Sequence, residues 1–318
     1  MRIALLTSGG DAPGMNPAIR AIVRTAIFNK IEVYGINNGY KGLIDGDLYE
    51  MKASSVGDII QRGGTILGTA RSERFLTEDG FKKALNVLDI YNIDGVIVLG
   101  GDGSFKGAEK LAKHGIKTIG IPCTIDNDLP YTDYTIGFWS AIETVMDAIG
   151  NLRDTSSSHG RANVIEVMGR HSGDLALYSA LAGGGESIIV PEEPVDIDEI
   201  CKKAMKGRLR GKKHNLIIVA EGVGDVFEIA DKIIEKTGID TKVTVLGHVQ
   251  RGGSPSAPDR IMGSLLGRKA VELLMAGNTE IVLGIKNNKL IEMNISEALN
   301  VEKEFNYDIF DTINILSV

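Results

Sequence analysis

Two neighbouring stretches decide the fold: Gly95-Val-Ile-Val-Leu-Gly-Gly-Asp-Gly-Ser104 and Thr118-Ile-Gly-Ile-Pro-Cys-Thr-Ile-Asp-Asn-Asp128. Each begins with an apolar run that is typical of a strand buried on both faces of a parallel sheet. Each continues into polar residues at the point where the strand ends. Because open α/β sheets bind ligands at the carboxyl ends of their strands, we expect residues 100–104 and 124–128 to contribute to one ligand site.

The polar residues of these stretches suit phosphoryl transfer. Glycine backbone lets phosphate groups approach closely, and Asp102, Asp126 and Asp128 supply carboxylates. One carboxylate can bind a divalent cation, and another can remove the proton of an attacking hydroxyl group. Plainer interpretations exist, since Ser104 can cap the following helix and aspartates after a strand are common in Asx turns. The sequence offers no such structural role for Asp102 between its two glycines, so the three acids together favour a metal-assisted kinase.

Strand and helix patterns alternate along almost the whole chain, which is the signature of an α/β fold with mainly parallel sheets. At 318 residues the chain is long enough for two domains. We expect strands at residues 3–7, 32–36, 96–100, 118–122, 163–168, 188–191, 216–220 and 243–246. We expect helices at residues 17–28, 104–113, 139–152, 174–181, 196–208, 228–236 and 258–275.

Composition excludes several partner classes. The net charge of −7 disfavours wholesale attraction to nucleic acid or to an anionic membrane, so an anionic substrate needs a locally basic pocket. The 2 cysteines have no paired spacing and the 5 histidines are dispersed. Residues 2–7 have the pattern of a core strand rather than a leader, and no apolar run reaches the length of a membrane span. The sequence therefore predicts a soluble cytoplasmic protein with neither a nucleic-acid nor a membrane partner.

A third glycine-rich segment, Thr7-Ser-Gly-Gly-Asp-Ala-Pro-Gly-Met-Asn16, joins the first strand to the first helix. Its backbone N–H groups are suited to a phosphate at a helix N-terminus, although many such loops are only tight turns. The chain has no Walker-type Gly-x-x-x-x-Gly-Lys sequence and no His-Arg-Asp loop. These absences exclude the P-loop and protein-kinase folds.

Residues 2–16, 100–104 and 124–128, together with Met168-Gly-Arg170, resemble bacterial ATP-dependent 6-phosphofructokinase. The resemblance extends from the first strand to about residue 290, and it implies two Rossmann-like three-layer α/β domains. It divides the chain into an ATP-binding domain and a fructose 6-phosphate-binding domain, at residues 1–137 plus 251–300 and residues 138–250 plus 301–318. The implied reaction transfers the γ-phosphoryl group of Mg-ATP to the 1-hydroxyl group of fructose 6-phosphate. Fructose 1,6-bisphosphate and ADP are the products of this allosterically regulated step of glycolysis.

The resemblance also assigns the catalytic and ATP-binding residues. Asp126 corresponds to the catalytic base, with Thr124 and Asp128 beside it. Arg170 corresponds to the residue that contacts the transferred phosphoryl group, a role that suits the planar and permanently charged guanidinium. The residues implied for ATP are Gly10, Arg71, Ser72, Gly101, Asp102, Gly103 and Ser104. Of these, Asp102 is also the implied ligand of Mg²⁺.

Fructose 6-phosphate is assigned a larger set, which is Thr124, Asp126, Arg161, Met168, Gly169, Arg170, Glu221, Lys242, His248 and Arg251. By resemblance His248 and Arg251 hold the 6-phosphate, and Arg161 and Lys242 reach it from a neighbouring subunit of a homotetramer. Lys242 stands where most members have arginine, and lysine supplies charge without a bidentate fork. Glu221 is expected to accept a sugar hydroxyl group, although its position alone fits a surface acid at a strand end equally well.

Two positions discriminate between phosphoryl donors. Pyrophosphate-dependent members tend to have aspartate in place of Gly103 and lysine in place of Cys123, so ATP is favoured here. Pyrophosphate-dependent phosphofructokinase remains the alternative. Lipid and NAD kinases share the Gly-Gly-Asp-Gly loop but lack the accompanying motifs, and a non-catalytic sugar-phosphate sensor would not need Asp126. Cys123 itself fits a small buried hydrophobe more plainly than a redox switch.

A second basic set lies away from these motifs. Residues 208–213 fit the solvated end of a helix, where positive charge is favourable. The resemblance instead implies an effector site for ADP or phosphoenolpyruvate at a subunit interface, made by Arg20, Arg24, Arg153, Gly184, Gly185, Glu186, Arg210, Lys212, Lys213 and His214. Ala53 stands where some members have arginine, so we expect a weaker effector response.

Overall fold

The chain forms two compact units, seen in a computed structural model that describes residues 1–317. Unit 1 contains Met1–Ile125, Leu129–Ser140 and Arg251–Lys303. Unit 2 contains Asp126–Asp128, Ala141–Gln250 and the chain from Glu304 onward. The boundaries expected from the resemblance lay after residues 137, 250 and 300, whereas the units divide after residues 140, 250 and 303 and the short segment 126–128 groups with unit 2.

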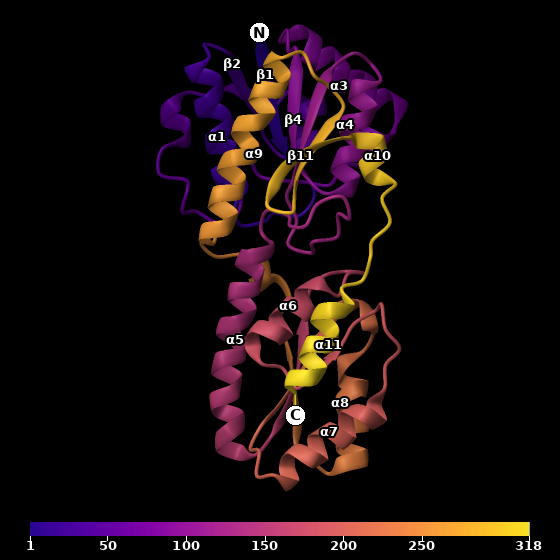
Figure 1. The fold of residues 1–318 in the computed structure, drawn as a ribbon. Helices are drawn as coiled ribbons and strands as arrows, with labels where there is room; N and C mark the ends of the chain where they lie inside the picture. The colour runs from indigo at the N-terminus through magenta and orange to yellow at the C-terminus, as the bar shows by residue number, and fades with distance from the viewer. Residues whose placement is uncertain (318) are drawn as a thin grey trace. The chain divides into compact units, whose positions relative to one another are not determined.

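Unit 1 is built on a seven-stranded sheet in the order β11-β10-β5-β4-β1-β2-β3 (Figure 1). The five inner strands are parallel to one another, and the edge strands β3 and β11 are antiparallel to their neighbours. The strands are β1 (Arg2–Thr7), β2 (Glu32–Ile36), β3 (Leu48–Glu50), β4 (Gly95–Gly100), β5 (Lys117–Pro122), β10 (Ile281–Lys286) and β11 (Lys289–Asn294).

Helices cover both faces of this sheet, and the middles of its inner strands are apolar and buried on both faces. Ala4 and Val96 face a core that includes Phe81 and Phe105, from helices on one side. Helices α1 and α9 pack against each other, and α9 also contacts β5. The helices of unit 1 are α1 (Met15–Phe28), α2 (Gly39–Asp45), α3 (Glu78–Ile90), α4 (Asp102–Ala112), α9 (Ala257–Met275) and α10 (Ile295–Leu299), with short 3₁₀ turns η1 (Ala53–Val56) and η2 (Glu73–Leu76).

Unit 2 is a second three-layer unit around four parallel strands in the order β7-β8-β6-β9. Along β8, Ile218 packs against α5, α6 and α11 on one face, and Ile217 packs against α7 and α8 on the other. Its strands are β6 (Ala162–Val167), β7 (Ser187–Ile189), β8 (Asn215–Ala220) and β9 (Thr241–Val245). Its helices are α5 (Phe138–His159), whose first turn belongs to unit 1, α6 (Asp174–Gly183), α7 (Ile197–Leu209), α8 (Val226–Thr237) and α11 (Tyr307–Leu316), with 3₁₀ turns η3 (Glu221–Val223) and η4 (Gly247–Arg251).

The predicted fold class, two three-layer α/β units with mainly parallel sheets, is confirmed. All eight expected strands and all seven expected helices are present, with shifted ends. The sequence patterns missed β3, β10, β11 and the helices α2, α3, α10 and α11. Within residues 1–317, no helix is both long enough and apolar enough to cross a membrane.

Candidate active site

The glycine-rich loops after β1 and β4 meet at one edge of the unit 1 sheet. The backbone N–H of Ser8 donates to the carbonyl oxygen of Leu99 at 2.9 Å. The hydroxyl group of Ser104 donates to the carbonyl oxygen of Ser8 at 3.2 Å. Parallel strands end at the same edge, so two segments far apart in sequence form one surface. Ser104 does not cap α4, because the helix begins two residues earlier and its N-cap is Gly101.

The N-terminus of α4 is open. A Cβ atom placed on Gly101 or Gly103 would have no other atom within 4 Å, so neither glycine is required by packing. The two glycines therefore leave space beside the start of this 11-residue helix, where the positive end of the helix dipole lies. An anion such as a phosphate group fits this position.

Asp102 has a structural partner that the sequence patterns did not indicate. It is the first residue of α4, and its carboxylate pairs with Lys106 at 2.7 Å. The pair has the (i, i+4) spacing of neighbours on one helix face, and both side chains are about half exposed or more. Such exposed pairs contribute little stability, so the carboxylate remains available to a cation.

Gly10 and Arg251, which the resemblance assigns to different ligands, lie against each other in unit 1. A side chain at Gly10 would collide with the guanidinium group of Arg251, so only glycine permits this approach. Arg251 Nε is buried, and no residue in the described part of the chain accepts its hydrogen bond. The guanidinium group of Arg251 thus lies over a glycine-rich loop and has an N–H group without an acceptor among residues 1–317. Such a group is suited to binding an anionic ligand.

The loop that carries Arg71 and Ser72 is tied to the same edge. The hydroxyl group of Thr69 donates to the carbonyl oxygen of Gly9 at 2.8 Å. Arg71 is exposed, and the buried Ser72 hydroxyl group has no hydrogen-bond partner among residues 1–317. Thr124, which also belongs to unit 1, forms backbone hydrogen bonds with Ile136 and through its carbonyl oxygen with Thr135.

In unit 2, Arg170 joins the two acids of the Thr-Ile-Asp-Asn-Asp motif. Its Nε lies 3.2 Å from Asp126 Oδ2, and its Nη1 lies 3.6 Å from Asp128 Oδ2. Only 1% of Asp126 is exposed, whereas the Arg170 side chain is about half exposed. A buried carboxylate next to an arginine can remove a proton from a hydroxyl group while the arginine contacts a phosphoryl group.

The backbone around this cluster is held in unusual conformations. Asn127 and Arg170 have positive φ angles of 49° and 53°, a region that costs energy for most residues. The Asn127 amide donates to Asp174 Oδ2 at 2.9 Å, and the Arg170 N–H donates to Glu221 Oε1 at 2.8 Å. Gly222 is required because a side chain there would collide with the carbonyl oxygen of Arg170. Glu221 thus positions Arg170 through the backbone, which is a role the sequence patterns did not suggest.

The remaining residues assigned to the sugar phosphate form two groups. Met168 N–H donates to the side chain of Gln250, which is fully buried, and His248 is exposed in the same 3₁₀ turn as Gln250. Gly169 follows with a φ angle of 139°, which favours glycine. The sequence patterns did not indicate that Gln250 binds the backbone at Met168. The only signal was its position two residues after His248 in the same loop.

Asp240 links the two basic residues of the second group. It accepts from Arg161 Nε at 2.6 Å and pairs with Lys242 Nζ at 2.8 Å. The hydrogen bond from Lys242 is the main cause that lowers the pKa of Asp240, and the bond from Arg161 acts in the same direction. The sequence patterns gave no sign of this acid, whose carboxylate contacts both bases.

Most of the proposed effector residues of unit 2 gather around the buried Glu186. Its Oε1 lies 2.9 Å from Lys212 Nζ and 3.5 Å from His214 Nε2. Arg153 donates to the carbonyl oxygens of Gly183 and Gly184 at the end of α6. Arg210 caps the end of α7, and Lys213 is exposed next to Lys212. Arg20 and Arg24 lie one turn apart on α1 in unit 1.

Cys123 is buried, and burial is the main cause that raises the pKa of its thiol well above the usual range. The carboxylate of Asp259 adds to this shift. Because the reactive form of cysteine is the thiolate, the structure supports the plainer interpretation of a small buried hydrophobe.

The fold and the candidate site together are typical of α/β proteins that bind and transfer phosphoryl groups. One unit offers an open helix N-terminus lined by glycine, and the other offers a buried carboxylate with an arginine. The sequence model of the phosphofructokinase family (PFK, phosphofructokinase) matches residues 2–274, and the chain belongs to this family. The resemblance inferred from the motifs is confirmed.

Individual relatives extend this result over the full length. The chain is 60% identical over 315 residues to the ATP-dependent 6-phosphofructokinase of Clostridium acetobutylicum, and the match covers 99% of each chain. It matches the structure of phosphofructokinase from Saccharomyces cerevisiae with a TM-score of 0.89 and 37% identity, over 99% of this chain and 48% of the yeast chain. The chain thus spans about half the length of that yeast chain.

A pyrophosphate-dependent phosphofructokinase from Marinobacter aquaeolei has the same fold. The TM-score is 0.86 at 24% identity, over 97% of this chain and 86% of that chain. At this identity the likeness shows the fold alone.

Proposed function

We propose that the chain is an ATP-dependent 6-phosphofructokinase of glycolysis. It transfers the γ-phosphoryl group of Mg-ATP to the 1-hydroxyl group of fructose 6-phosphate, and it releases fructose 1,6-bisphosphate and ADP. The observation that carries the proposal is the buried Asp126 carboxylate with Arg170 at 3.2 Å. A base for a hydroxyl proton beside a phosphate-binding cation is what this transfer requires. The 60% identity to the ATP-dependent 6-phosphofructokinase of Clostridium acetobutylicum, over 99% of each chain, supports the same reaction.

In this proposal unit 1 binds ATP and unit 2 binds fructose 6-phosphate. Asp126 removes the proton of the 1-hydroxyl group, the sugar oxygen attacks the γ-phosphorus, and the bond to the leaving ADP oxygen breaks. Arg170 stays protonated and offsets the negative charge on the transferred group. Arg170 pairs with Asp126 and Asp128, and the transferred phosphoryl group is a third anion that it can contact.

The residues of unit 1 fit a magnesium ion that arrives with the nucleotide. Mg²⁺ is usually bound by one or two carboxylates together with substrate phosphate oxygens. Asp102 is one exposed carboxylate at the start of α4, and residues 1–317 contain no cluster of three or more metal-binding side chains. When bound, the ion neutralises charge on the triphosphate.

The donor is the first point to test. We expect purified protein to phosphorylate fructose 6-phosphate with ATP and Mg²⁺ in an aldolase-coupled assay, and to show little activity with pyrophosphate. The open space at Gly103 supports ATP, because a nucleotide needs more room than pyrophosphate. Turnover with pyrophosphate alone would replace the proposal by the alternative donor, and no turnover with either would remove it.

The proposal includes regulation and assembly. We assign the residues around Glu186, together with Arg20 and Arg24, to an ADP or phosphoenolpyruvate site in a cytoplasmic homotetramer. Arg161 and Lys242 then serve the sugar-phosphate site of a neighbouring subunit. An effector changes affinity only if it binds two arrangements of the protein unequally.

The test of regulation is fructose 6-phosphate saturation with and without millimolar effector, in the native chain and in Lys212→Ala. We expect the curve to shift with little change in maximal rate, and the shift to be lost in the variant. Lys206→Ala on the exposed face of α7 is the matched control. Curves that superimpose in the native chain would exclude a working effector site.

A further inference from the structure

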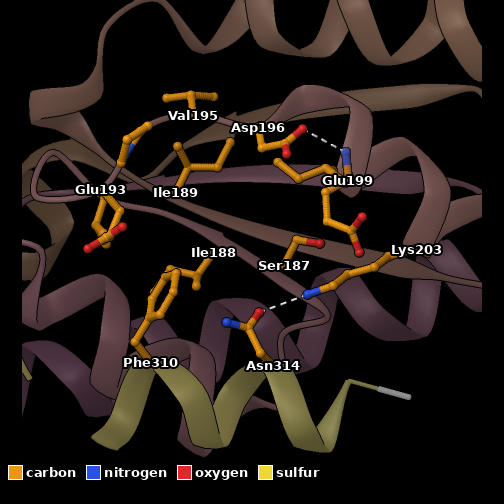
Figure 2. Close-up of a pocket in the computed structure, with 13 residues that line it drawn as sticks. Ser187, Ile188, Ile189, Glu193, Val195, Asp196, Glu199, Lys203, Phe310 and Asn314 are labelled. Atoms are coloured by element: carbon orange, nitrogen blue, oxygen red, sulfur yellow. Dashed lines mark hydrogen bonds between the residues drawn. The ribbon is translucent and has the colours of Figure 1, made fainter. Parts of the chain in front are cut away.

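A pocket in unit 2 lies outside every residue set described above. It has a volume of about 170 Å³ and lies between β7, the start of α7 and the helix α11 (Figure 2). A cavity of about 150 Å³ is enough to hold benzene, so the pocket admits a ligand of roughly six to ten non-hydrogen atoms. Nucleotides and sugar phosphates are too large for it.

One end of the pocket is polar and the other is apolar. Figure 2 shows the Ser187 hydroxyl group, the Glu199 carboxylate and the Lys203 ammonium group at the same end. Phe310 and Val195 lie toward the other end. Small-molecule sites have this composition, with an apolar lining and a few convergent polar groups.

Ser187 offers the pocket a hydroxyl group that is not used elsewhere in the described part of the chain. The residue is only 5% exposed and lines the pocket, and no residue in the described range 1–317 forms a hydrogen bond with its hydroxyl group. The hydroxyl group lies at the pocket wall, where water or a ligand can bond to it, so it can donate to a ligand carboxylate.

The two charged groups at this end do not neutralise each other. Glu199 and Lys203 have the (i, i+4) spacing that favours an ion pair, yet no ion pair of the described residues includes Lys203. Lys203 Nζ donates instead to the neutral Asn314 Oδ1 at 2.8 Å. Glu199 reaches only Lys202, at 3.9 Å. Glu199 and Lys203 therefore offer the pocket one negative and one positive group that are not paired with each other.

The other two acids of the lining already have structural partners. Asp196 accepts the backbone N–H of Glu199 at 2.9 Å and caps α7. Glu193 accepts the hydroxyl group of Tyr307, and this bond is the main cause that raises the pKa of Tyr307. Neither partner is a cation, so both acids keep their charge and the lining as a whole has three carboxylates and one ammonium group. Glu199 and Lys203 are the two charged groups that we consider for a ligand at the polar end.

We propose that this pocket binds an apolar α-amino acid. The ligand carboxylate meets Lys203 and Ser187, the ligand ammonium group meets Glu199, and the apolar side chain packs toward Phe310 and Val195. A zwitterion matches both charges at once, whereas an amine or a carboxylic acid would leave one of them unmatched. Each charge-assisted hydrogen bond contributes enough affinity that losing one costs about tenfold or more.

The test is isothermal titration of the full chain with L-valine, L-leucine and L-isoleucine, which does not depend on catalytic activity. We expect at least one of them to bind with one ligand per chain. Two probes of nearly the same shape, isoamylamine and 4-methylpentanoate, each lack one charge of leucine and should bind at least tenfold more weakly than leucine if leucine is the ligand. Binding by none of the three amino acids, or equal binding of a singly charged probe, would overturn the proposal.

Variants locate the ligand. Lys203→Met, Glu199→Gln and Ser187→Ala should each weaken amino-acid binding about tenfold, while Lys206→Met on the same helix should leave it unchanged. Lys212→Ala, at the proposed effector cluster, should also leave it unchanged. If Lys212→Ala abolished binding while Ser187→Ala and Lys203→Met preserved it, the ligand would be elsewhere and the assignment wrong.

Discussion

The two ligand regions are built in opposite ways. The strand ends of unit 1 offer backbone and empty space, since Gly101 and Gly103 have no other atom near the position of a Cβ atom. The corresponding region of unit 2 is filled with charges that already pair, because Arg170 contacts both Asp126 and Asp128. A polyphosphate needs room and N–H donors, whereas the deprotonation of a hydroxyl group needs a base fixed in place. The region of unit 1 thus depends on the lack of side chains at Gly101 and Gly103, and the region of unit 2 depends on side chains that pair.

The largest effect on turnover is expected when the region of unit 2 loses its base. We expect Asp126→Asn to lower turnover by roughly a hundred- to ten-thousand-fold, because a positioned base contributes a factor of this size. The Michaelis constant for ATP should change little, since the substitution is in unit 2. The measurement is steady-state kinetics in both substrates.

Asp126→Ser serves as a second variant that removes the base with a smaller side chain. Circular dichroism should show that both variants are folded. Turnover within a few-fold of the native value in either folded variant would remove Asp126 from its role.

The open region is tested by filling it. Gly103→Asp should raise the Michaelis constant for ATP about tenfold or more, because a carboxylate would occupy the space and repel the triphosphate. Thermal stability should not fall, since an acid in the first turn of α4 is favourable and glycine inside a helix is not.

Gly103→Ala is the matched control, because it adds volume without charge. We expect a smaller rise in the Michaelis constant for ATP and a small gain in stability. Unchanged ATP kinetics in Gly103→Asp would show that the start of α4 does not face the nucleotide.

The open region was also the more predictable from sequence. Strand β4 is a continuous apolar run followed by glycine and aspartate, so its place in a parallel sheet could be predicted. The paired region depends on partners from distant segments, such as Asp174 for Asn127 and Glu221 for Arg170. A single sequence contains no local signal for such pairs.

Some of the helices and strands that were not predicted do have recognisable signals in the sequence. Helix α3 buries one face through Phe81, Ala84 and Leu88, and acids occupy its first turn after the N-cap residue. The β10–β11 hairpin turns at Asn287 and Asn288, whose φ angles of 51° and 59° suit a two-residue turn. The ion pair of Asp102 with Lys106 was missed because the helix was expected to start at Ser104. With that start, Asp102 lies outside the helix and has no (i, i+4) neighbour on it.

A smaller effect is expected where the charges are exposed. Lys242→Ala should raise the Michaelis constant for fructose 6-phosphate roughly five- to tenfold and leave that for ATP unchanged, because an exposed cation contributes less than a buried one. Lys242→Arg should lower the constant below the native value, since a guanidinium binds phosphate with two bonds. If neither variant changed sugar-phosphate affinity, the assignment of Lys242 would be wrong.

The smallest effect concerns the pH dependence of stability around Glu186. Burial lowers the pKa of His214, and Arg153 and Lys212 act in the same direction against Glu186. Since the pKa in the unfolded chain is higher, at about 6.5, the unfolded state takes up more protons as the pH falls through this value. The stabilisation linked to neutral His214 is therefore present above about pH 6.5 and is lost below it. We expect native protein to lose more thermal stability between pH 7.5 and pH 5.5 than His214→Gln, which cannot titrate, and parallel losses in the two proteins would show that His214 does not sense this pH change.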